Sequence, residues 1–365
     1  MPGLYLHIPY CAQKCLYCGF TSFAGADRFA MERYIRALKR ELTIRAQSVS
    51  DLCFDTIFVG GGTPSLLPAD LFSDLIDHAR STLRVSDGAE FTCECNPESA
   101  SEALFHVWRA CGVNRVSIGV QTFNDALLQR IGRVHTAAQA VKAVQAAQDA
   151  GFVRVGIDLI CGLPGQTPED FKKTLQTAIG LAVGHISCYQ LEIEPGTPLH
   201  EQVQGAAIIP KNGDESADDM ALAAQTLALA GYRRYEVSNF ALSGQACVHN
   251  QNYWRRGAYL GAGLAAHSFL HGCRAWNTAD MQTYLNGSFE ADSEAVTPEA
   301  ALEETVMLSL RTCEGLIARL LPEGMLKNAQ TLCNRGMLTL HNGRFTATER
   351  GFEVLNQVIF YIIGD

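Results

Sequence analysis

The stretch "LYLHIPYCAQKCLYC" (residues 4–18) joins a short strand-like run to three cysteines within eight positions. Further runs of β-branched and aromatic residues recur along the chain, and longer segments of helical period separate them. Those runs are "DTIFVG" (55–60), "EFTCEC" (90–95), "VNRVSIGV" (113–120), "VRVGIDLI" (153–160) and "HISCYQLE" (185–192). This alternation is typical of βα units on a parallel sheet, and it predicts six of them. In the first helical segment, Glu32-Arg36 and Glu41-Arg45 are expected to be i,i+4 pairs on the solvent side.

Six units before residue 195 fit either an incomplete barrel or an open doubly wound sheet. The positions of the unusual polar residues favour the barrel, because each lies at or just after the end of a predicted strand. These residues are Cys11, Cys15, Cys18, Gly60, Gly61, Gly62, Thr63, Glu94, Gln121, Asp158, Gln190 and Glu192. In a barrel those ends converge on one mouth. We therefore predict an α/β fold with a partial (β/α)6 barrel over residues 1–195.

The βα rhythm stops after Pro195, and two further segments follow. Residues 196–296 are predicted to extend the barrel. Residues 297–365 contain helices around a hairpin at Asn342-Gly343, which predicts a helical, winged-helix-like domain. Because the chain carries a net charge of −9 and no basic block, we interpret this domain as a packing or partner module and expect no nucleic-acid partner.

The sequence predicts neither a targeting signal nor a set of disulfide bonds. The N-terminal stretch lacks a basic segment before an apolar run, so we expect a cytoplasmic protein. The 13 cysteines are odd in number and unevenly spaced, which favours reduced thiols. Most of those outside residues 11–18 are expected to be small buried hydrophobes, among them Cys53, Cys93, Cys111, Cys161, Cys188 and Cys313.

Three thiolates with spacings of four and three positions can converge on one metal centre. A 4Fe-4S cluster with one open iron needs only three, whereas a structural zinc site needs four closed ligands. Nearby, only His7 could complete a zinc site, and it lies in the first strand. The spacing favours the cluster over zinc and over structural or redox thiols, and all three alternatives stay open on the residues alone.

"CAQKCLYC" (11–18) resembles the CxxxCxxC motif of radical S-adenosylmethionine (SAM) enzymes, where SAM chelates the open iron. Other segments resemble the oxygen-independent coproporphyrinogen III oxidase group, and within it the HemW haem chaperones. They are "GGGTP" (60–64), "ECNPE" (94–98), "GVQTF" (119–123), "IGRVH" (131–135), "DLICGLPGQT" (158–167) and "HNQNYW" (249–254). The resemblance implies a 4Fe-4S cluster on Cys11, Cys15 and Cys18. It implies SAM contacts from Tyr5, Tyr17, Gly61, Gly62, Thr63, Glu94, Gln121, Arg133 and Asp158.

Two of these motifs also have simpler interpretations. The glycines of "GGGTP" would let backbone approach the SAM amino group, but a glycine run also forms ordinary turns. The six residues of "HNQNYW" could form a capped turn with packed rings. In this family a porphyrin ligand needs aromatic stacking and often an axial histidine, so the resemblance makes His249 the candidate haem ligand.

Phe20 distinguishes two functions within the group. The decarboxylating members carry a fourth cysteine there, whereas HemW-type proteins carry Phe, which we expect to pack over the cluster. The resemblance therefore implies a haem chaperone rather than a coproporphyrinogen dehydrogenase of porphyrin biosynthesis. Its partners would be haem and an acceptor haemoprotein. We expect the acceptor to be a respiratory protein, and we expect peripheral membrane contact through that acceptor. A zinc-binding barrel without redox chemistry is the third alternative.

Overall fold

The computed structural model describes residues 1–364 of the chain. Its centre is a twelve-stranded sheet in which six parallel strands lie in sequence order. They are β1 (Gly3–Ile8), β4 (Phe54–Gly61), β5 (Val85–Cys95), β6 (Arg115–Gln121), β7 (Val155–Cys161) and β8 (His185–Gln190). Because the order never reverses, right-handed crossovers place every connecting helix on the same side. The prediction of a partial barrel is confirmed, and a doubly wound sheet is excluded.

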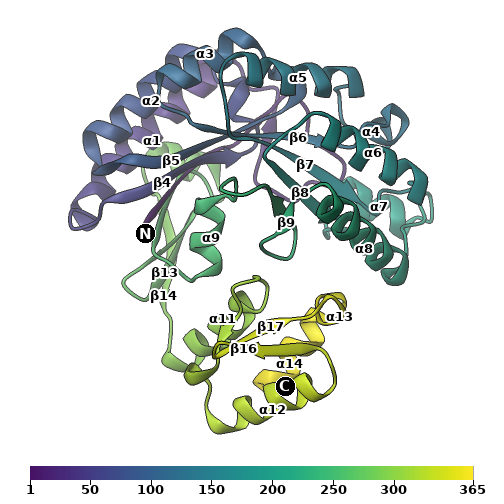
Figure 1. Ribbon diagram of the computed structural model, residues 1–365. Coiled ribbons are helices and arrows are strands. Elements are labelled where there is room, and N and C mark those ends of the chain that lie inside the picture. Colours follow the sequence, from purple (N-terminus) through teal and green to yellow (C-terminus); the bar gives the residue numbers. More distant parts are fainter. Residues whose placement is uncertain (365) are drawn as a thin grey trace.

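The connecting helices cover the outer, convex side of the sheet, as Figure 1 shows. They are α1 (Arg28–Ser48), α2 (Ala69–Thr82), α3 (Glu102–Ala110), α4 (Asp125–Arg130), α5 (Ala137–Asp149), α6 (Pro168–Gly180) and α8 (Gly213–Leu229). A short α7 (Pro198–Gln204) precedes α8. One continuous apolar core lies between these helices and the strands. The inner, concave side of the sheet is left for polar side chains.

Helix α1 shows how the helical pattern leads to packing. The Asp27 side chain caps it by accepting a hydrogen bond from the Ala30 amide (2.8 Å). Its apolar face, which includes Tyr34 and Leu38, is buried as its spacing predicts. Glu41 was expected on the solvent side, and that expectation is wrong. Its carboxylate is fully buried and accepts hydrogen bonds from the Tyr284 hydroxyl (2.6 Å) and the Gly263 amide (2.8 Å).

Residues 233–295 add strands at both edges of the parallel sheet. On the β8 side these are β10 (Asn239–Ala241) and β9 (Arg233–Arg234); on the β1 side they are β11 (Tyr259–Ala262), β12 (His267–Leu270), β13 (Cys273–Asn277) and β14 (Glu290–Ala295). Strand β11 pairs in parallel with β1, so the sheet's first strand is internal. A helix between these groups, α9 (Val248–Trp254), carries the "HNQNYW" motif, and α10 (Met281–Asn286) precedes β14.

The C-terminal region has a separate apolar core, centred on Leu310, Leu332, Phe345 and Ile359. It lies across the open side of the barrel in Figure 1. Its elements are α11 (Pro298–Ser309), β15 (Leu316–Ile317), α12 (Glu323–Asn334), β16 (Leu338–His341), β17 (Arg344–Ala347), α13 (Glu349–Glu353) and α14 (Leu355–Ile363). Asn342 (φ 49°) and Gly343 (φ 73°) form the hairpin turn, whose positive φ angles match a type I′ turn.

The division at 195/196 and 296/297 stays a proposal, which the separate C-terminal core supports. The last residue of the third predicted segment, 365, lies outside the described residues. All 13 cysteines lie within the described part, and each is a free thiol. Cys313 was expected to be buried but is exposed. Across residues 1–364, no helix combines the length and the apolar character that crossing a bilayer requires.

Candidate functional site

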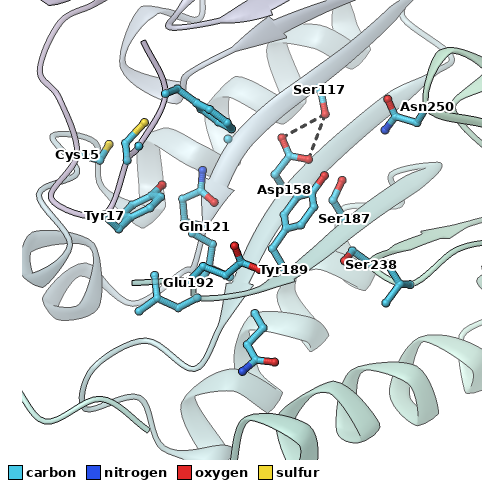
Figure 2. A pocket seen from close by; sticks show the side chains of 18 of the residues that line it. Cys15, Tyr17, Ser117, Gln121, Asp158, Ser187, Tyr189, Glu192, Ser238 and Asn250 are labelled. Atoms are coloured by element: carbon cyan, nitrogen blue, oxygen red, sulfur yellow. Dashed lines mark hydrogen bonds between the residues drawn. The ribbon is translucent and has the colours of Figure 1, made fainter. Parts of the chain in front are cut away.

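The concave side of the barrel encloses a cavity of about 1090 Å³ that reaches from the cysteine loop to the C-terminal domain. Figure 2 shows side chains from several parallel strands pointing into it. At its mouth are the carboxyl ends of the strands, as the positions of the polar residues predicted. Predicted residues that line it are Cys11, Cys15, Tyr17, Cys18, Gly61, Gly62, Thr63, Glu94, Gln121, Arg133, Asp158, Gln190 and Glu192. The structure therefore brings together residues more than 150 positions apart.

The cysteine loop is fixed by backbone hydrogen bonds to other elements. The Leu16 amide donates to the Ile131 carbonyl (3.1 Å), and the Leu16 carbonyl accepts from the Leu199 amide (2.8 Å). All three thiols are partly buried and border the cavity. Burial raises the pKa of the Cys18 thiol. Within residues 1–364, no three His, Cys, Asp or Glu side chains stand close enough together to hold a metal ion.

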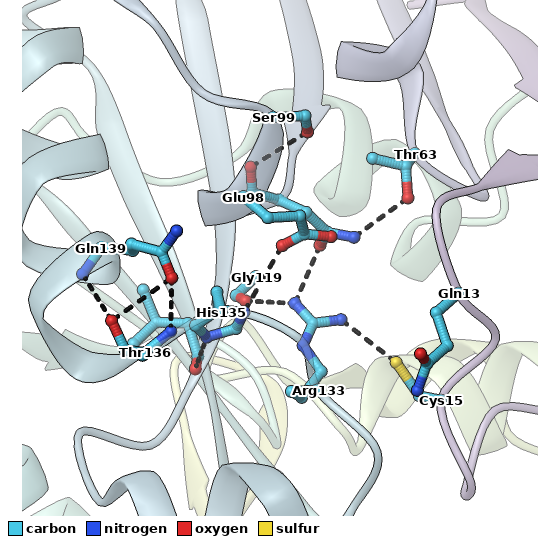
Figure 3. A network of polar contacts seen from close by, with 12 residues as sticks. Gln13, Cys15, Thr63, Glu98, Ser99, Gly119, Arg133, His135, Thr136 and Gln139 are labelled. Carbon is cyan, nitrogen blue, oxygen red and sulfur yellow. Dashed lines mark hydrogen bonds and ion pairs between the residues drawn. The ribbon is translucent and has the colours of Figure 1, made fainter.

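Arg133 connects this loop to two other motifs, as Figure 3 shows. Its guanidinium donates to the Cys15 sulfur (3.3 Å) and to the Asn96 side-chain oxygen (2.8 Å). Asn96 in turn donates to the Thr63 hydroxyl (2.9 Å), so "ECNPE" and "GGGTP" are linked through one amide. Burial lowers the pKa of Arg133, but the Tyr17 phenol and the Cys15 thiol raise it more, so Arg133 stays charged.

The Nε atom of Arg133 is buried, and nothing among residues 1–364 accepts a hydrogen bond from it. An unpaired donor on a permanently charged group favours an anionic ligand atom at this point of the cavity. The cysteine loop contributes three thiols to this part of the cavity wall, whereas the buried Cys95 thiol at the end of β5 donates to the Asn96 carbonyl (3.4 Å) and the imidazole of His185 lines the cavity at the start of β8. This chemistry fits an iron–sulfur cluster with a carboxylate-bearing cofactor better than a four-ligand zinc site.

His7 is not available as a fourth zinc ligand. Its Nδ1 lies 3.0 Å from the Tyr5 hydroxyl and its Nε2 lies 2.9 Å from the Thr21 carbonyl, so both ring nitrogens have partners. Tyr5 itself does not line the cavity, unlike the other predicted SAM residues. Its hydroxyl instead positions His7.

The glycines of "GGGTP" are required for packing against other residues of the chain, whether or not a ligand is bound. A Cβ at Gly61, where φ is 109°, would lie 2.3 Å from the His7 ring, and a Cβ at Gly62 would lie 2.7 Å from the Tyr10 carbonyl. Their backbone also supplies one specific contact, because the Gly61 amide donates to Glu94 (3.0 Å). The glycines do allow a close approach of the backbone, as predicted. Among the described residues, the groups that approach it are His7, Tyr10 and Glu94.

Glu94 and Asp158 face the cavity rather than the outer surface, which excludes the interpretation as solvated surface acids. Burial, with a contribution from Asp158, raises the pKa of Glu94 to about 7. Burial also raises the pKa of Asp158, whose carboxylate accepts from the Ser117 hydroxyl (3.2 and 3.3 Å). A cationic ligand would lower both pKa values and keep both groups ionised.

Gln121 lies at the end of β6 in the left-handed region (φ 67°), which is rare for a residue with a Cβ. The pairing of β6 with β7 shifts by one residue at this point, between Gly119 and Gln121. The bulge turns the Gln121 side chain toward the cavity, as Figure 2 shows. Backbone strain of this kind is commonly retained at binding sites.

His249 does not reach the cavity. The imidazole is 1% exposed, its Nδ1 lies 2.7 Å from the Thr56 hydroxyl, and its Nε2 lies 2.8 Å from the Tyr253 hydroxyl. Burial lowers its pKa to about 4. Neither ring nitrogen is free to ligate a haem iron here, so the structure favours the packed interpretation of the motif. Only Asn250 from "HNQNYW" borders the cavity.

Phe20 also differs from expectation. It borders the cavity at the mouth, but it is 69% exposed rather than packed over the cysteines. The reason is local: the preceding Gly19 packs against the Glu194 side chain, while the Phe20 carbonyl accepts from the Lys14 ammonium (3.1 Å). These contacts fix the backbone and leave the ring outside.

A second group of cavity residues, near the start of the strands, was not predicted from the sequence. Arg115 opens β6 and His185 opens β8, and both line the cavity. One feature could have identified Arg115: it is a charged residue in a strand whose other residues are all buried. Such a residue is almost never fully buried without a partner or a role.

Comparisons with known proteins identify the family and the fold. The Radical SAM superfamily matches residues 5–178, and the HemN C-terminal domain matches residues 296–354. The chain is 34% identical to the haem chaperone HemW of Mycobacterium tuberculosis, over 99% of this chain and 95% of that protein. It is 32% identical to the HemW of Bacillus subtilis over the full length of both. Coproporphyrinogen III oxidase (HemN) from Escherichia coli has the same fold, with a TM-score of 0.86, 24% identity and coverage of 99% and 90% of the two chains.

Proposed function

The chain belongs to the HemW family of haem chaperones within the radical SAM superfamily, and we propose that it binds haem in this cavity and transfers it to an acceptor haemoprotein. The observation that carries the proposal is the continuity of the cavity. One space of about 1090 Å³ borders the three cysteines, the polar strand ends and the C-terminal domain. That volume exceeds what a single cofactor of ordinary size needs.

The mouth suits the cluster and SAM. Cys11, Cys15 and Cys18 would hold a 4Fe-4S cluster, which when bound supplies redox-active iron with one open coordination position. Arg133 fixes the Cys15 sulfur and stays charged beside it. We assign Glu94 and Asp158 to the cationic part of SAM, because two carboxyls with raised pKa values gain most from a positive ligand.

The side of the cavity away from the cysteines suits a flat, apolar ligand. Val237, Phe352 and Leu355 contribute apolar surface there, and Tyr189 projects into the cavity from the end of β8. Because Phe352 and Leu355 belong to the C-terminal domain, that domain forms part of the binding wall. Movement of the domain would open this side for transfer. The acceptor we propose is a respiratory haemoprotein met from the cytoplasm, with membrane contact only through that acceptor.

Haem binding and coproporphyrinogen turnover separate the chaperone from the oxidase. Anaerobically reconstituted protein is titrated with haem while the Soret band is followed, and is then mixed with an apo-haemoprotein. We expect saturable binding and transfer of the Soret signal to the acceptor. The same preparation with SAM, a reductant and coproporphyrinogen III is expected to release no carbon dioxide. Decarboxylation without haem binding would instead establish the oxidase.

A further inference from the structure

The cavity has a floor at the amino ends of β6, β7 and β8, opposite the cysteine loop. Arg115 opens β6, His185 opens β8, and Gly156 lies between them in β7, paired with His185. Strand β6 has seven residues, so the backbone of Arg115 lies about 20 Å from that of Gln121 at the other end of the strand. The Arg115 charge still acts on Glu94 and Asp158, which lie between the two ends. No motif in the sequence points to the three floor positions, because they come from three separate strands.

Arg115 is a buried cation whose acidic neighbours have other partners. Its side chain is 2% exposed and lines the cavity. Glu90 pairs instead with Arg154 (2.7 Å) and accepts from the His249 amide (2.9 Å). Asp158 accepts from the Ser117 hydroxyl. In the described part of the chain, no carboxylate lies within ion-pair distance of the Arg115 guanidinium.

His185 presents an unpaired N–H at the same place. The Tyr235 oxygen accepts from the Cys247 amide (3.3 Å), so its own proton is available for His185 Nε2, 2.8 Å away. We assign Nε2 as the acceptor of that proton, which places the hydrogen of the neutral ring on Nδ1. Burial lowers the pKa of His185 well below its usual value, which keeps the ring neutral. Nδ1 is buried, and among residues 1–364 it has no partner.

Gly156 leaves open the space that both groups face. A Cβ at this position would lie 3.2 Å from His185 Nδ1 and 3.3 Å from Arg115 Nη2. A buried cation without an ion-pair partner and one unpaired N–H therefore lie beside the same small volume at the bottom of the cavity. Leaving buried donors unpaired is costly unless a ligand satisfies them.

We propose that Arg115, His185 and the space over Gly156 form a carboxylate-binding subsite, and that it takes one propionate of haem. The identification with haem rests on the proposed function. A planar guanidinium beside a single N–H matches the two oxygens of a carboxylate. A flexible propionate arm can reach the floor while the ring stays higher in the cavity. SAM, placed at the mouth, also has a carboxylate, so the test must separate the two sources.

Haem and haem dimethyl ester differ only in whether the propionates are charged. Both are titrated into the anaerobically reconstituted full chain, with the Soret band as the readout. The variants are Arg115→Met, which removes the charge, and Gly156→Ala, which fills the space but keeps the guanidinium. Arg109→Met, on the outer surface of α3, and Gly180→Ala, where a Cβ meets nothing within 4 Å, are the matched controls.

In the wild type we expect haem to bind at least about tenfold more tightly than the ester, because a charge-assisted hydrogen bond is lost in the ester. Both floor variants should bind haem about tenfold more weakly and the ester unchanged. Gly156→Ala, which keeps the guanidinium, should also leave the SAM affinity unchanged. The two control variants should keep the wild-type preference. If Arg115→Met fails to fold, Gly156→Ala carries the test.

Equal affinity of the wild type for haem and its ester would overturn the subsite and leave the proposed function intact. The subsite would also be overturned if Arg115→Met and Gly156→Ala both bound haem as tightly as the wild type. Loss of SAM affinity in place of haem affinity would overturn the assignment to haem. A wild type that binds no haem would overturn the proposed function, and this inference with it.

Discussion

The mouth and the floor of one cavity are built in different ways. At the mouth, functional side chains lie in loops and at a bulge, and they are tied to one another, as Arg133 is to Cys15 and Asn96. At the floor, Arg115 and His185 lie in regular strands, where Arg115 has no ion-pair partner and His185 Nδ1 has no hydrogen-bond partner among the described residues. The mouth is thus held in place by its own contacts, whereas strand register alone positions the floor. Substitutions should therefore have different consequences at the two ends.

The largest effect is expected at the cysteine loop. Cys15→Ala removes one of the three thiols of the cysteine loop, so we expect it to lose nearly all iron and sulfide after anaerobic reconstitution. Cys313→Ala, which removes an exposed thiol of the C-terminal region, is the control and should retain the full content. Iron and sulfide analysis makes the comparison. Full cluster content in Cys15→Ala would show that the mouth is not the cluster site.

Glu94→Gln tests the electrostatics of the mouth. Burial raises the pKa of Glu94 to about 7 from a usual 4.5, so the folded state binds this proton more tightly than the unfolded state. The resulting stability is present below about pH 4.5 and is lost as the pH rises through about 7. Between pH 5 and pH 8 the free energy of unfolding should fall by about 2 to 3 kcal/mol more in the wild type than in the variant.

Urea unfolding at the two pH values measures this difference. Glu236, whose pKa burial also raises to about 7, titrates in the same window in both proteins. It therefore cancels in the comparison. Identical pH dependence of the wild type and Glu94→Gln would mean that the Glu94 carboxyl is well solvated.

His249→Ala separates a structural role from haem ligation. The variant leaves the Thr56 and Tyr253 hydroxyls without their partner and opens space beside Phe58, so we expect a loss of about 2 kcal/mol in the free energy of unfolding. The haem dissociation constant should stay within about twofold. Tyr253→Phe is the milder control, at about 1 kcal/mol. A changed Soret band in His249→Ala with unchanged stability would restore the axial role.

The smallest effect is expected for Phe20, the exposed ring at the mouth. Phe20 is 69% exposed, so Phe20→Ala should change the free energy of unfolding by less than about 0.5 kcal/mol. Chemical denaturation with and without SAM makes the measurement. A loss of several kcal/mol would show that the ring packs over the cysteine loop in solution.

The predictions from sequence succeeded where the spacing of residues along a strand determines where a side chain lies in the fold. The strand runs and the polar residues at their ends placed Cys15, Glu94 and Asp158 on one cavity, because parallel strands share an orientation. The prediction for Glu41 failed because a helical pattern does not reveal the buried Tyr284 hydroxyl that reaches it from a distant segment. The burial of His249 could not be predicted for the same reason, since its partner Thr56 comes from β4. Arg115 and His185 were missed because only register brings them together.

The central claim is that three sulfurs at the mouth hold a cluster with one iron open to SAM. The most direct test is the low-temperature electron paramagnetic resonance spectrum of the reconstituted, reduced protein, recorded with and without SAM. The account predicts the signal of a reduced 4Fe-4S cluster whose g values change when SAM is added. A signal indifferent to SAM, or a colourless protein that contains zinc, would contradict it.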